Sequence, residues 1–373
     1  MSGAFSFSEQ RPALRNVTGI DWALVAAALM LALVGLATVN SASAELAGNQ
    51  LARQGLWVGI GCCAMLAAAL FNYRTLIEFA FPIYLFGLSL LITVLLVGRV
   101  AGGARSWLGY AGIGLQPAEV AKLTTALWLA SYLASIDRRT LGLREIVLSG
   151  LIVAVPIALI ALQPDLGSAA MFVPLLAGML LVGGIDRKVL VGGLVAALVL
   201  GAALWFFGLH DYQRQRITSF LNPNADPLGA GYQVQQSKIA VGSGELTGKG
   251  YMQGTQSQLR FLPARHTDFV FAVLAEEWGF LGTLAVLGLY AMWIVNAFRI
   301  ALRAREKEAV LLIVGLVSLF SFHVVYNTAM VVGFVPITGI PLPFLSYGGS
   351  FTLLNFAITG LILGIDAKRY VNA

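Results

Sequence analysis

The chain has 373 residues, of which 58% are hydrophobic and 11% are charged, and its mean hydropathy is +0.81. A typical soluble domain has about 25% charged residues, so the composition excludes a soluble enzyme, and the excess of apolar residues excludes a disordered chain. The net charge of +6 sets orientation in a membrane protein, and no nucleic-acid partner is expected.

Apolar runs of about 20 residues, the length that crosses a bilayer as a helix, follow one another along the chain. Ten spans are predicted, at about 22–39, 55–71, 76–97, 117–135, 145–162, 167–184, 188–208, 269–298, 309–333 and 350–366. Lys and Arg concentrate on the side of the N-terminus, which predicts that both termini are cytoplasmic.

The expected architecture is therefore an all-α polytopic membrane protein. A cytoplasmic tail is expected over 1–19, a single ten-helix membrane domain over 20–367, and a second cytoplasmic tail over 368–373.

Three segments between the spans are expected to be irregular and to converge on the outer face. They are the glycine-rich stretch 98–116, the long loop 209–268 between the seventh and eighth spans, and the proline-rich stretch 335–350. Irregular backbone at membrane depth persists only where it is buried in protein or lines a wet cavity, so their convergence would form a site. The long loop is expected to form short helices in the headgroup layer or to act only as an outer lid.

Ionisable residues within or beside the spans are candidate site residues. Glu119 and Lys122 are spaced i, i+3, so they either neutralise each other or leave Lys122 to bind an anion. Asp165 either caps the next helix or faces a cavity. Glu276 and Glu277 are adjacent in the eighth span, so at most one of them faces a given cavity.

Asp268 lies where the long loop becomes the eighth span. It either caps that helix or, between an apolar wall and basic groups, is tuned as a general base. The basic residues of the outer face are Arg105, Lys122, Arg214, Arg216, Lys238, Lys249, Arg260 and Arg265. They indicate binding of a phosphorylated lipid, the alternative being ordinary contact with anionic headgroups.

Read together, these segments resemble the SEDS family of bacterial cell-wall proteins (shape, elongation, division and sporulation) over essentially all ten spans. The motifs are 103–108, 116–119 with Lys122, 163–167, 248–250, 266–269, 341–344 and 346–350. The stretch 254–259 is similar to the RodA elongation branch of the family rather than the FtsW division branch. Ala264 stands where the family usually has Glu, and Glu245 where it usually has a second Gly.

The resemblance implies a peptidoglycan glycosyltransferase that polymerises lipid II into a glycan strand during cell elongation, at the outer face of the bacterial inner (cytoplasmic) membrane. It implies a class B penicillin-binding protein transpeptidase as partner, which we expect on the eighth and ninth spans. The alternatives are a lipid II flippase that breaks no bond and a scaffold that only positions a partner.

By the same likeness Asp268 is the catalytic carboxylate, acting as general base while undecaprenyl diphosphate leaves. The cations expected to neutralise that diphosphate are Arg105, Lys122, Lys238 and Lys249. Glu119 and Asp165 are expected to line the same cavity, and Gln256, Ser257, His266 and Thr267 to complete the substrate site. No cofactor is certain, and a divalent cation, Mg²⁺ or Mn²⁺, is left open.

Overall fold

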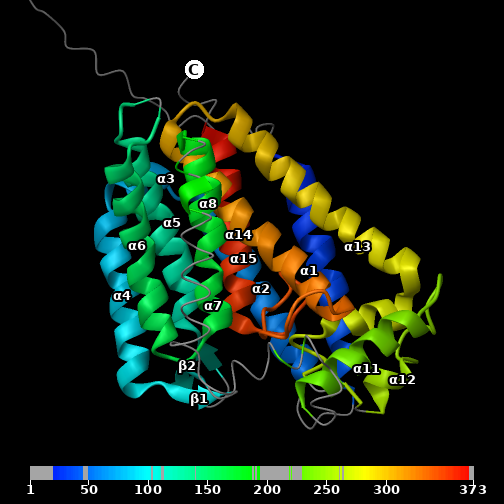
Figure 1. Cartoon of the computed structure of the whole chain (residues 1–373). Helices are drawn as coiled ribbons and strands as arrows, with labels where there is room; N and C mark the ends of the chain where they lie inside the picture. Colours follow the sequence, from blue (N-terminus) through cyan, green and yellow to red (C-terminus); the bar gives the residue numbers. More distant parts are fainter. Residues whose placement is uncertain are drawn as a thin grey trace, which may run out of the picture.

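A computed structural model describes residues 20–44, 49–101, 104–110, 113–138, 140–186, 189, 191–193, 218, 220, 229–259, 261–262 and 264–368. Long helices pack side by side, and a small sheet and the helices α11 and α12 lie at one end of the bundle (Figure 1). We call this end the outer end, because it carries the segments that the sequence places outside.

Helices account for most of the described residues. They are α1 (Trp22–Ser43), α2 (Gln50–Leu70), α3 (Tyr73–Glu78), α4 (Ala80–Val97), α5 (Pro117–Ala134), α6 (Leu143–Ala161), α7 (Leu166–Ala170), α8 (Phe172–Gly183), α11 (Ala230–Ser243), α12 (Thr255–Gln258), α13 (Val270–Arg303), α14 (Lys307–Val332) and α15 (Gly349–Lys368). Eight stretches of the described chain, with α7 and α8 counted as one, are long and apolar enough to cross a membrane. The protein is therefore a mostly helical, polytopic membrane protein.

Two of the ten predicted spans are not among these eight. The span predicted at 117–135 forms α5, whose apolar character is reduced by Glu119 and Lys122. This helix contacts α4, α6, α8, α14 and α15, so protein surrounds its charged residues. The span predicted at 188–208 lies outside the described residues, except for 189 and 191–193.

The prediction that the stretch 98–116 is irregular was wrong. It forms a three-stranded antiparallel sheet of β1 (Arg99–Ala101), β2 (Ala104–Tyr110) and β3 (Ile113–Leu115), in the order β1-β2-β3. Trp107 lies opposite Arg99 in one pair of strands, and Leu108 lies opposite Leu115 in the other. The strands form because apolar and β-branched residues, which favour strands, lie between the glycines. The fold is therefore not purely α-helical.

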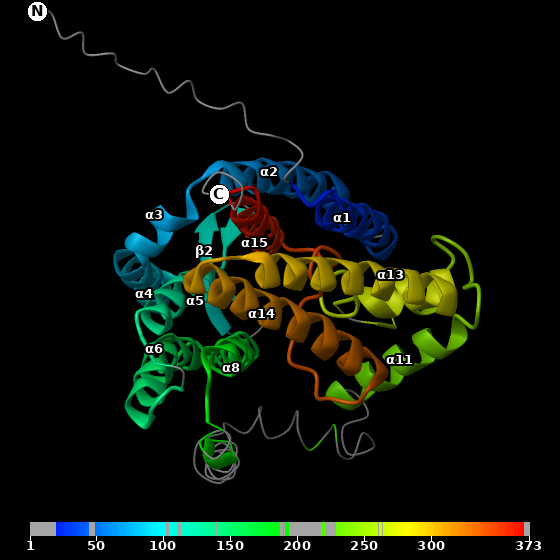
Figure 2. The ribbon, with the colours of Figure 1, turned by 90° about the horizontal axis from the view of Figure 1, so that it is seen from above.

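The helices α14 and α15 occupy the middle of the bundle. Seen along its axis, α14 lies between α8 and α13, and α15 lies between α2 and α14 (Figure 2). Gly360 lets α15 approach α2 closely, because a Cβ there would lie 2.1 Å from the carbonyl oxygen of Met65. The rings of Trp293 and Phe320 stack with centroids 3.7 Å apart and fix α13 against α14.

The helix α13 is broken at Gly279, whose φ of 64° and ψ of −164° are not helical. Four backbone hydrogen bonds to the turn that follows α11 repair the break: residues 280 and 281 donate to the carbonyls of 245 and 246, and residues 249 and 250 donate to the carbonyls of 276 and 277, at 2.9–3.0 Å. The turn 244–250 and the outer part of α13 therefore form one unit, in which these hydrogen bonds satisfy backbone groups that the break would leave unpaired.

Candidate functional site

Asp268 ends a tight turn at the outer end of α13. The turn is closed by a hydrogen bond of 3.0 Å from the Asp268 amide to the carbonyl of Ala264, whose φ is 48°. Phe269 occupies the N-cap position of α13 and makes no side-chain capping bond, so Asp268 lies one residue before the cap. Its side chain is partly exposed.

The proline-rich stretch 335–348 packs on this turn. The Tyr347 amide donates to the carbonyl of His266 at 2.9 Å, and the Ser346 hydroxyl donates to the carbonyl of Thr267 at 2.6 Å. The rings of His266 and Tyr347 meet edge to face with centroids 5.7 Å apart. The expectation that this stretch is irregular is confirmed in the described chain, and the stretch meets the end of the long loop, one of the two segments with which it was expected to converge.

Side chains from the helices satisfy the carbonyl groups of this stretch. Its prolines lack N–H groups, so the regular backbone hydrogen bonding of a helix or hairpin is interrupted at those positions. The donors are Tyr326 to Pro336 at 3.1 Å, Asn327 to Ile340 at 2.8 Å, His323 to Pro341 at 3.1 Å and Tyr290 to Pro343 at 2.5 Å. Irregular backbone is thereby held at the outer end without unpaired carbonyls at these positions.

Residues 338–341 are the point at which the separate parts of the site meet. A Cβ on Gly339 would lie 3.6 Å from Oδ2 of Asp268, and one on Gly167 would lie 2.7 Å from the carbonyl oxygen of Thr338. Asn327 bonds the carbonyl of Asp268 at 2.9 Å as well as that of Ile340. The 338–341 segment therefore touches Asp268, α7 and α14 at once.

Glu119 and Lys122 form a buried ion pair on α5. Lys122 Nζ lies 2.8 Å from Oε1 of Glu119 and 3.3 Å from Nε2 of His323, and it faces the ring of Phe351 with 5.7 Å to the centroid. Their exposed fractions are 3% for Glu119 and 1% for Lys122. Of the two readings of the i, i+3 spacing, the structure contains the paired one, and through His323 the pair reaches the 338–341 segment.

Asp165 caps a helix, one of its two expected roles. Its Oδ1 accepts from the Ser168 amide at 3.0 Å at the start of α7, and its Oδ2 accepts from the Ser168 hydroxyl at 2.8 Å. Gln116, at the N-cap of α5, donates to the same Oδ2 at 3.2 Å. Asp165 therefore joins the outer ends of α5 and α7 next to the 338–341 segment.

Lys249, Gln256 and Ser257 gather around Glu276, about two turns along α13 from Asp268. Lys249 Nζ lies 2.7 Å from Oε1 of Glu276, which is fully buried. The amides of Gln256 and Ser257 donate to Oε1 and Oε2 of Glu276, so this carboxylate holds the start of α12. Glu277 points instead toward α1, where the hydroxyl of Ser41 donates to it.

Arg105 and Lys238 are exposed. Arg105, on β2, donates to the carbonyl of Leu95 at 3.2 Å. The stem of Lys238, on α11, runs beside Gly333 at the outer end of α14, since a Cβ on Gly333 would lie 2.1 Å from its Cε. Among the described residues, no hydrogen bond joins either side chain to the 338–341 segment.

His266 lies two residues before Asp268, and its surroundings disfavour the charged form of its imidazole. Burial, and then the positive charge of Arg265, lower the pKa of His266 below its ordinary value. At neutral pH the imidazole is therefore uncharged and offers hydrogen bonds rather than a cation. Thr267, next in the chain, donates to the carbonyl of Ala264 at 3.2 Å.

No group of three or more His, Cys, Asp or Glu that could hold a metal ion occurs among the described residues. A divalent cation has no preformed three-ligand site in this part of the chain.

Sequence reasoning missed the polar residues of α14 that hold the site, His323 and Asn327, and also Gln54 of α2. Gln54 is buried, donates to Thr352 at 3.1 Å and accepts from the Gly348 amide at 3.2 Å. The available signal was a polar residue inside an apolar span, because such a group must find a partner. The partners lie in an irregular stretch, which gives no periodicity to follow.

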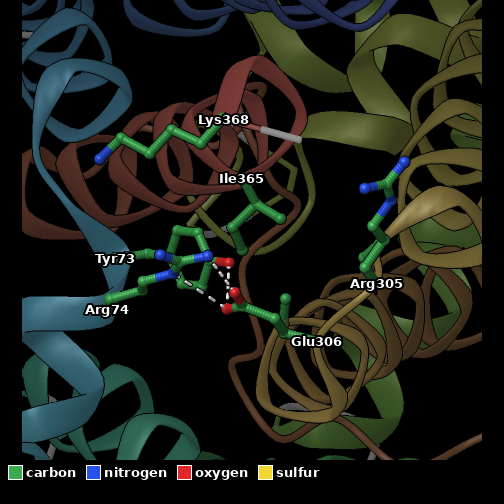
Figure 3. Close-up of a pocket in the computed structure, with 8 residues that line it drawn as sticks. Tyr73, Arg74, Arg305, Glu306, Ile365 and Lys368 are labelled. Atoms are coloured by element: carbon green, nitrogen blue, oxygen red, sulfur yellow. Dashed lines mark hydrogen bonds and ion pairs between the residues drawn. The ribbon is translucent and has the colours of Figure 1, made fainter. Parts of the chain in front are cut away.

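A small pocket lies at the opposite, inner end of the bundle, where Tyr73 and Arg74 of α3 meet Glu306 (Figure 3). Tyr73 donates to Glu306 at 2.5 Å, and Arg74 forms an ion pair with it. Burial favours the neutral carboxyl, but these two partners outweigh it and lower the pKa of Glu306. Burial and the bond to Glu306 raise the pKa of Tyr73 to about 12. The bonds from Tyr73 and Arg74 to Glu306 fix the turn between α13 and α14, at the end of the bundle opposite the outer site.

The fold and site define a class: a polytopic helical membrane protein in which a partly exposed carboxylate, a buried ion pair and a proline-rich stretch meet at one end. Residues 20–371 match the FtsW/RodA/SpoVE family of cell cycle proteins. The chain belongs to this family.

Relatives with assigned names are similar over most of the chain. The peptidoglycan glycosyltransferase MrdB of Escherichia coli K12 is 38% identical over 84% of each chain. The peptidoglycan glycosyltransferase RodA of Treponema pallidum is 31% identical over 95% of this chain and 99% of its own, and stage V sporulation protein E of Bacillus subtilis is 36% identical with the same coverage.

Two solved structures share the fold. One is a chain from a structure on how a peptidoglycan synthase complex coordinates polymerization and crosslinking. It matches with a TM-score of 0.82 and 33% identity, over 94% of this chain and 98% of its own. The rod shape determining protein RodA of Thermus thermophilus matches with a TM-score of 0.70 and 30% identity, over 95% and 99%.

Proposed function

We propose that the protein is a peptidoglycan glycosyltransferase that polymerises lipid II, with Asp268 as its general base. The observation that carries this proposal is the position of Asp268: a partly exposed carboxylate at the outer end, held on its backbone side by Asn327 and beside Gly339. The names of the relatives support the same activity.

In the proposed reaction, the 4-hydroxyl oxygen of the acceptor N-acetylglucosamine attacks the anomeric carbon of the donor N-acetylmuramic acid. The hydroxyl proton passes to a carboxylate oxygen of Asp268, and the bond from the anomeric carbon to the diphosphate oxygen breaks. Undecaprenyl diphosphate leaves with the bonding electron pair. Attack from the opposite face converts an α-linked donor into a β-linked polymer.

The leaving diphosphate needs cations, because general-base assistance alone contributes roughly 10²–10⁴ in rate. Lys238 and Arg105 are exposed and able to reach a headgroup, and Lys249 retains part of its surface beside Glu276. Lys122 is enclosed in this conformation and would reach a phosphate only if its cluster opened. Gln256, Ser257, His266 and Thr267 remain proposed hydrogen-bonding contacts to the saccharide.

We place the protein in the inner membrane with ten spans: the eight described above, α5, and the span that the sequence predicts at 188–208. Both termini are then cytoplasmic, and the site faces the periplasm or cell exterior. The proposed transpeptidase partner, a class B penicillin-binding protein, contacts α13 and the exposed edge of α14. The helix α13 supports this assignment, since Leu281, Leu284 and Leu302 are 58%, 54% and 87% exposed.

The test is Asp268→Asn, which keeps the shape of the side chain and removes the base. We expect purified protein with its partner transpeptidase to lose lipid II polymerisation by about 10²–10⁴-fold, with an unchanged melting temperature. Asp137→Asn, an exposed carboxylate beyond the inner end of α5, is the matched control and should retain full activity.

Undiminished glycan synthesis by Asp268→Asn would contradict the assignment. If wild-type protein moves labelled lipid II across a vesicle bilayer but makes no glycan, the flippase alternative replaces it. Loss of activity only on altering the lipid-facing surface of α13 would instead indicate a scaffold.

A further inference from the structure

Asn327 joins two parts of the site that are far apart in the sequence. It is fully buried on α14, and the two N–H bonds of its amide are directed at two backbone carbonyl oxygens, that of Asp268 at 2.9 Å and that of Ile340 at 2.8 Å. Carbonyl oxygens only accept, so the amide orientation is fixed with nitrogen toward both. The Asn327 Oδ1 atom has no partner among the described residues.

One turn earlier on the same face of α14, His323 holds the next residue of the segment. Its Nδ1 lies 3.1 Å from the carbonyl of Pro341, and its Nε2 lies 3.3 Å from Lys122 Nζ. The carbonyl requires a proton on Nδ1, and the ammonium, which only donates, requires a bare Nε2. His323 therefore holds the neutral Nδ1–H form, which Glu119 supports by fixing Lys122 at 2.8 Å.

We propose that Asn327, with the chain His323–Lys122–Glu119, is a positioning device for Asp268. This proposal rests on the proposed function. Asn327 holds the carbonyl of Ile340, and His323 holds the carbonyl of Pro341, the next residue. These two bonds fix the neighbouring Gly339, whose Cα faces Oδ2 of Asp268. Asn327 in addition holds the main chain of Asp268 itself. The position of the Asp268 carboxylate relative to a saccharide hydroxyl then depends on buried groups that do not themselves contact the substrate.

The proposal assigns Glu119 and Lys122 an indirect role. Both are nearly inaccessible, so their loss should disturb the 338–341 segment rather than remove a ligand of the diphosphate. A misplacement of about 1 Å at a reacting group can lower the rate about 10²-fold, so a small shift of the segment is sufficient.

The test is Asn327→Leu, which has a similar volume and no donor. We expect kcat for lipid II polymerisation to fall about 10- to 100-fold while KM changes less than about twofold, because positioning acts on the transition state. Hydrogen exchange at the Tyr347 amide, which donates to His266, should speed up as the turn and the segment separate. Lys122→Met should give the same kcat and exchange pattern.

Asn355→Leu is the matched control. Asn355 is a buried asparagine on α15, and among the described residues its side chain donates only to the carbonyl one turn earlier, that of Phe351, at 2.8 Å. It should leave kcat and Tyr347 exchange close to wild type.

A rise in KM with kcat preserved, for either Asn327→Leu or Lys122→Met, would overturn the positioning role, as would unchanged Tyr347 exchange in both variants. If Asn327→Leu misfolds, kcat, KM and Tyr347 exchange are measured instead in Lys122→Met and in the milder variant His323→Asn, with the same expected results. Failure of the proposed function would look different: Asp268→Asn would keep its activity, while faster Tyr347 exchange in Asn327→Leu would persist.

Discussion

At the scale of the residue, Glu245 adopts a backbone conformation that glycine adopts at lower cost. Its φ is 47°, its side chain is exposed, and its carbonyl, which accepts from Phe280, does not depend on the side chain. A left-handed conformation costs a residue with a Cβ about 1–2 kcal/mol. Glycine avoids this cost, but it loses more backbone entropy on folding, which offsets part of the gain. We expect Glu245→Gly to stabilise the fold by about 0.5–1 kcal/mol, measured as a higher melting temperature in detergent.

The control is Thr247→Gly, an exposed neighbour whose φ is not positive. It should lower the melting temperature, because there glycine adds only entropy to the unfolded chain. A fall for both variants would show that the Glu245 carboxylate contributes more than its backbone costs.

Single residues also show where sequence reasoning about the site succeeded. The i, i+3 spacing offered the Glu119–Lys122 pair as one of two readings, and the structure contains it, because helix geometry places the two side chains together. The Lys249–Glu276 pair was not predicted, since it joins a turn to a helix across the break at Gly279. Whether Asp268 is the base stays a prediction.

At the scale of the element, the break in α13 depends on one glycine. A Cβ at Gly279 would lie 2.3 Å from the Gly248 amide nitrogen, and the φ of 64° is strained for any other residue. We expect Gly279→Ala to destabilise the protein by about 2 kcal/mol or more and to increase hydrogen exchange over 244–250.

Gly288→Ala, farther along the same helix, is the matched control. Nothing lies within 4 Å of a Cβ there, and alanine is about 1 kcal/mol better than glycine inside a helix. It should therefore raise the melting temperature. Equal effects of the two substitutions would contradict a structural role for the break.

The elements that sequence patterns predicted well are the long apolar helices, because span length and hydropathy are set by the bilayer. The sheet over 99–115 was missed, since strands of three to seven residues separated by glycines leave too little alternation to detect. The split between α7 and α8 was also hidden within a single apolar run.

At the scale of the whole molecule, the proposed orientation makes opposite predictions for the two ends. In a chain with Cys62→Ser and Cys63→Ser, a membrane-impermeant maleimide applied to intact spheroplasts should label Arg105→Cys and not Lys307→Cys. Both positions are exposed; Arg105 lies on β2, at the outer end of the bundle, and Lys307 begins α14, at the inner end. Labelling of both after permeabilisation is the control, and the reverse pattern in intact spheroplasts would place the site on the cytoplasmic side.

The proline-rich stretch has a consequence for how the protein is assembled. Its acceptors are satisfied by side chains of α13 and α14, and Gln54 of α2 binds its end. Those helices are far apart in the sequence, so we expect the stretch to take this conformation only after all three have docked. If Asp268 is the base, we therefore expect its site to be completed only after these helices have docked, so that a partly assembled chain makes no glycan.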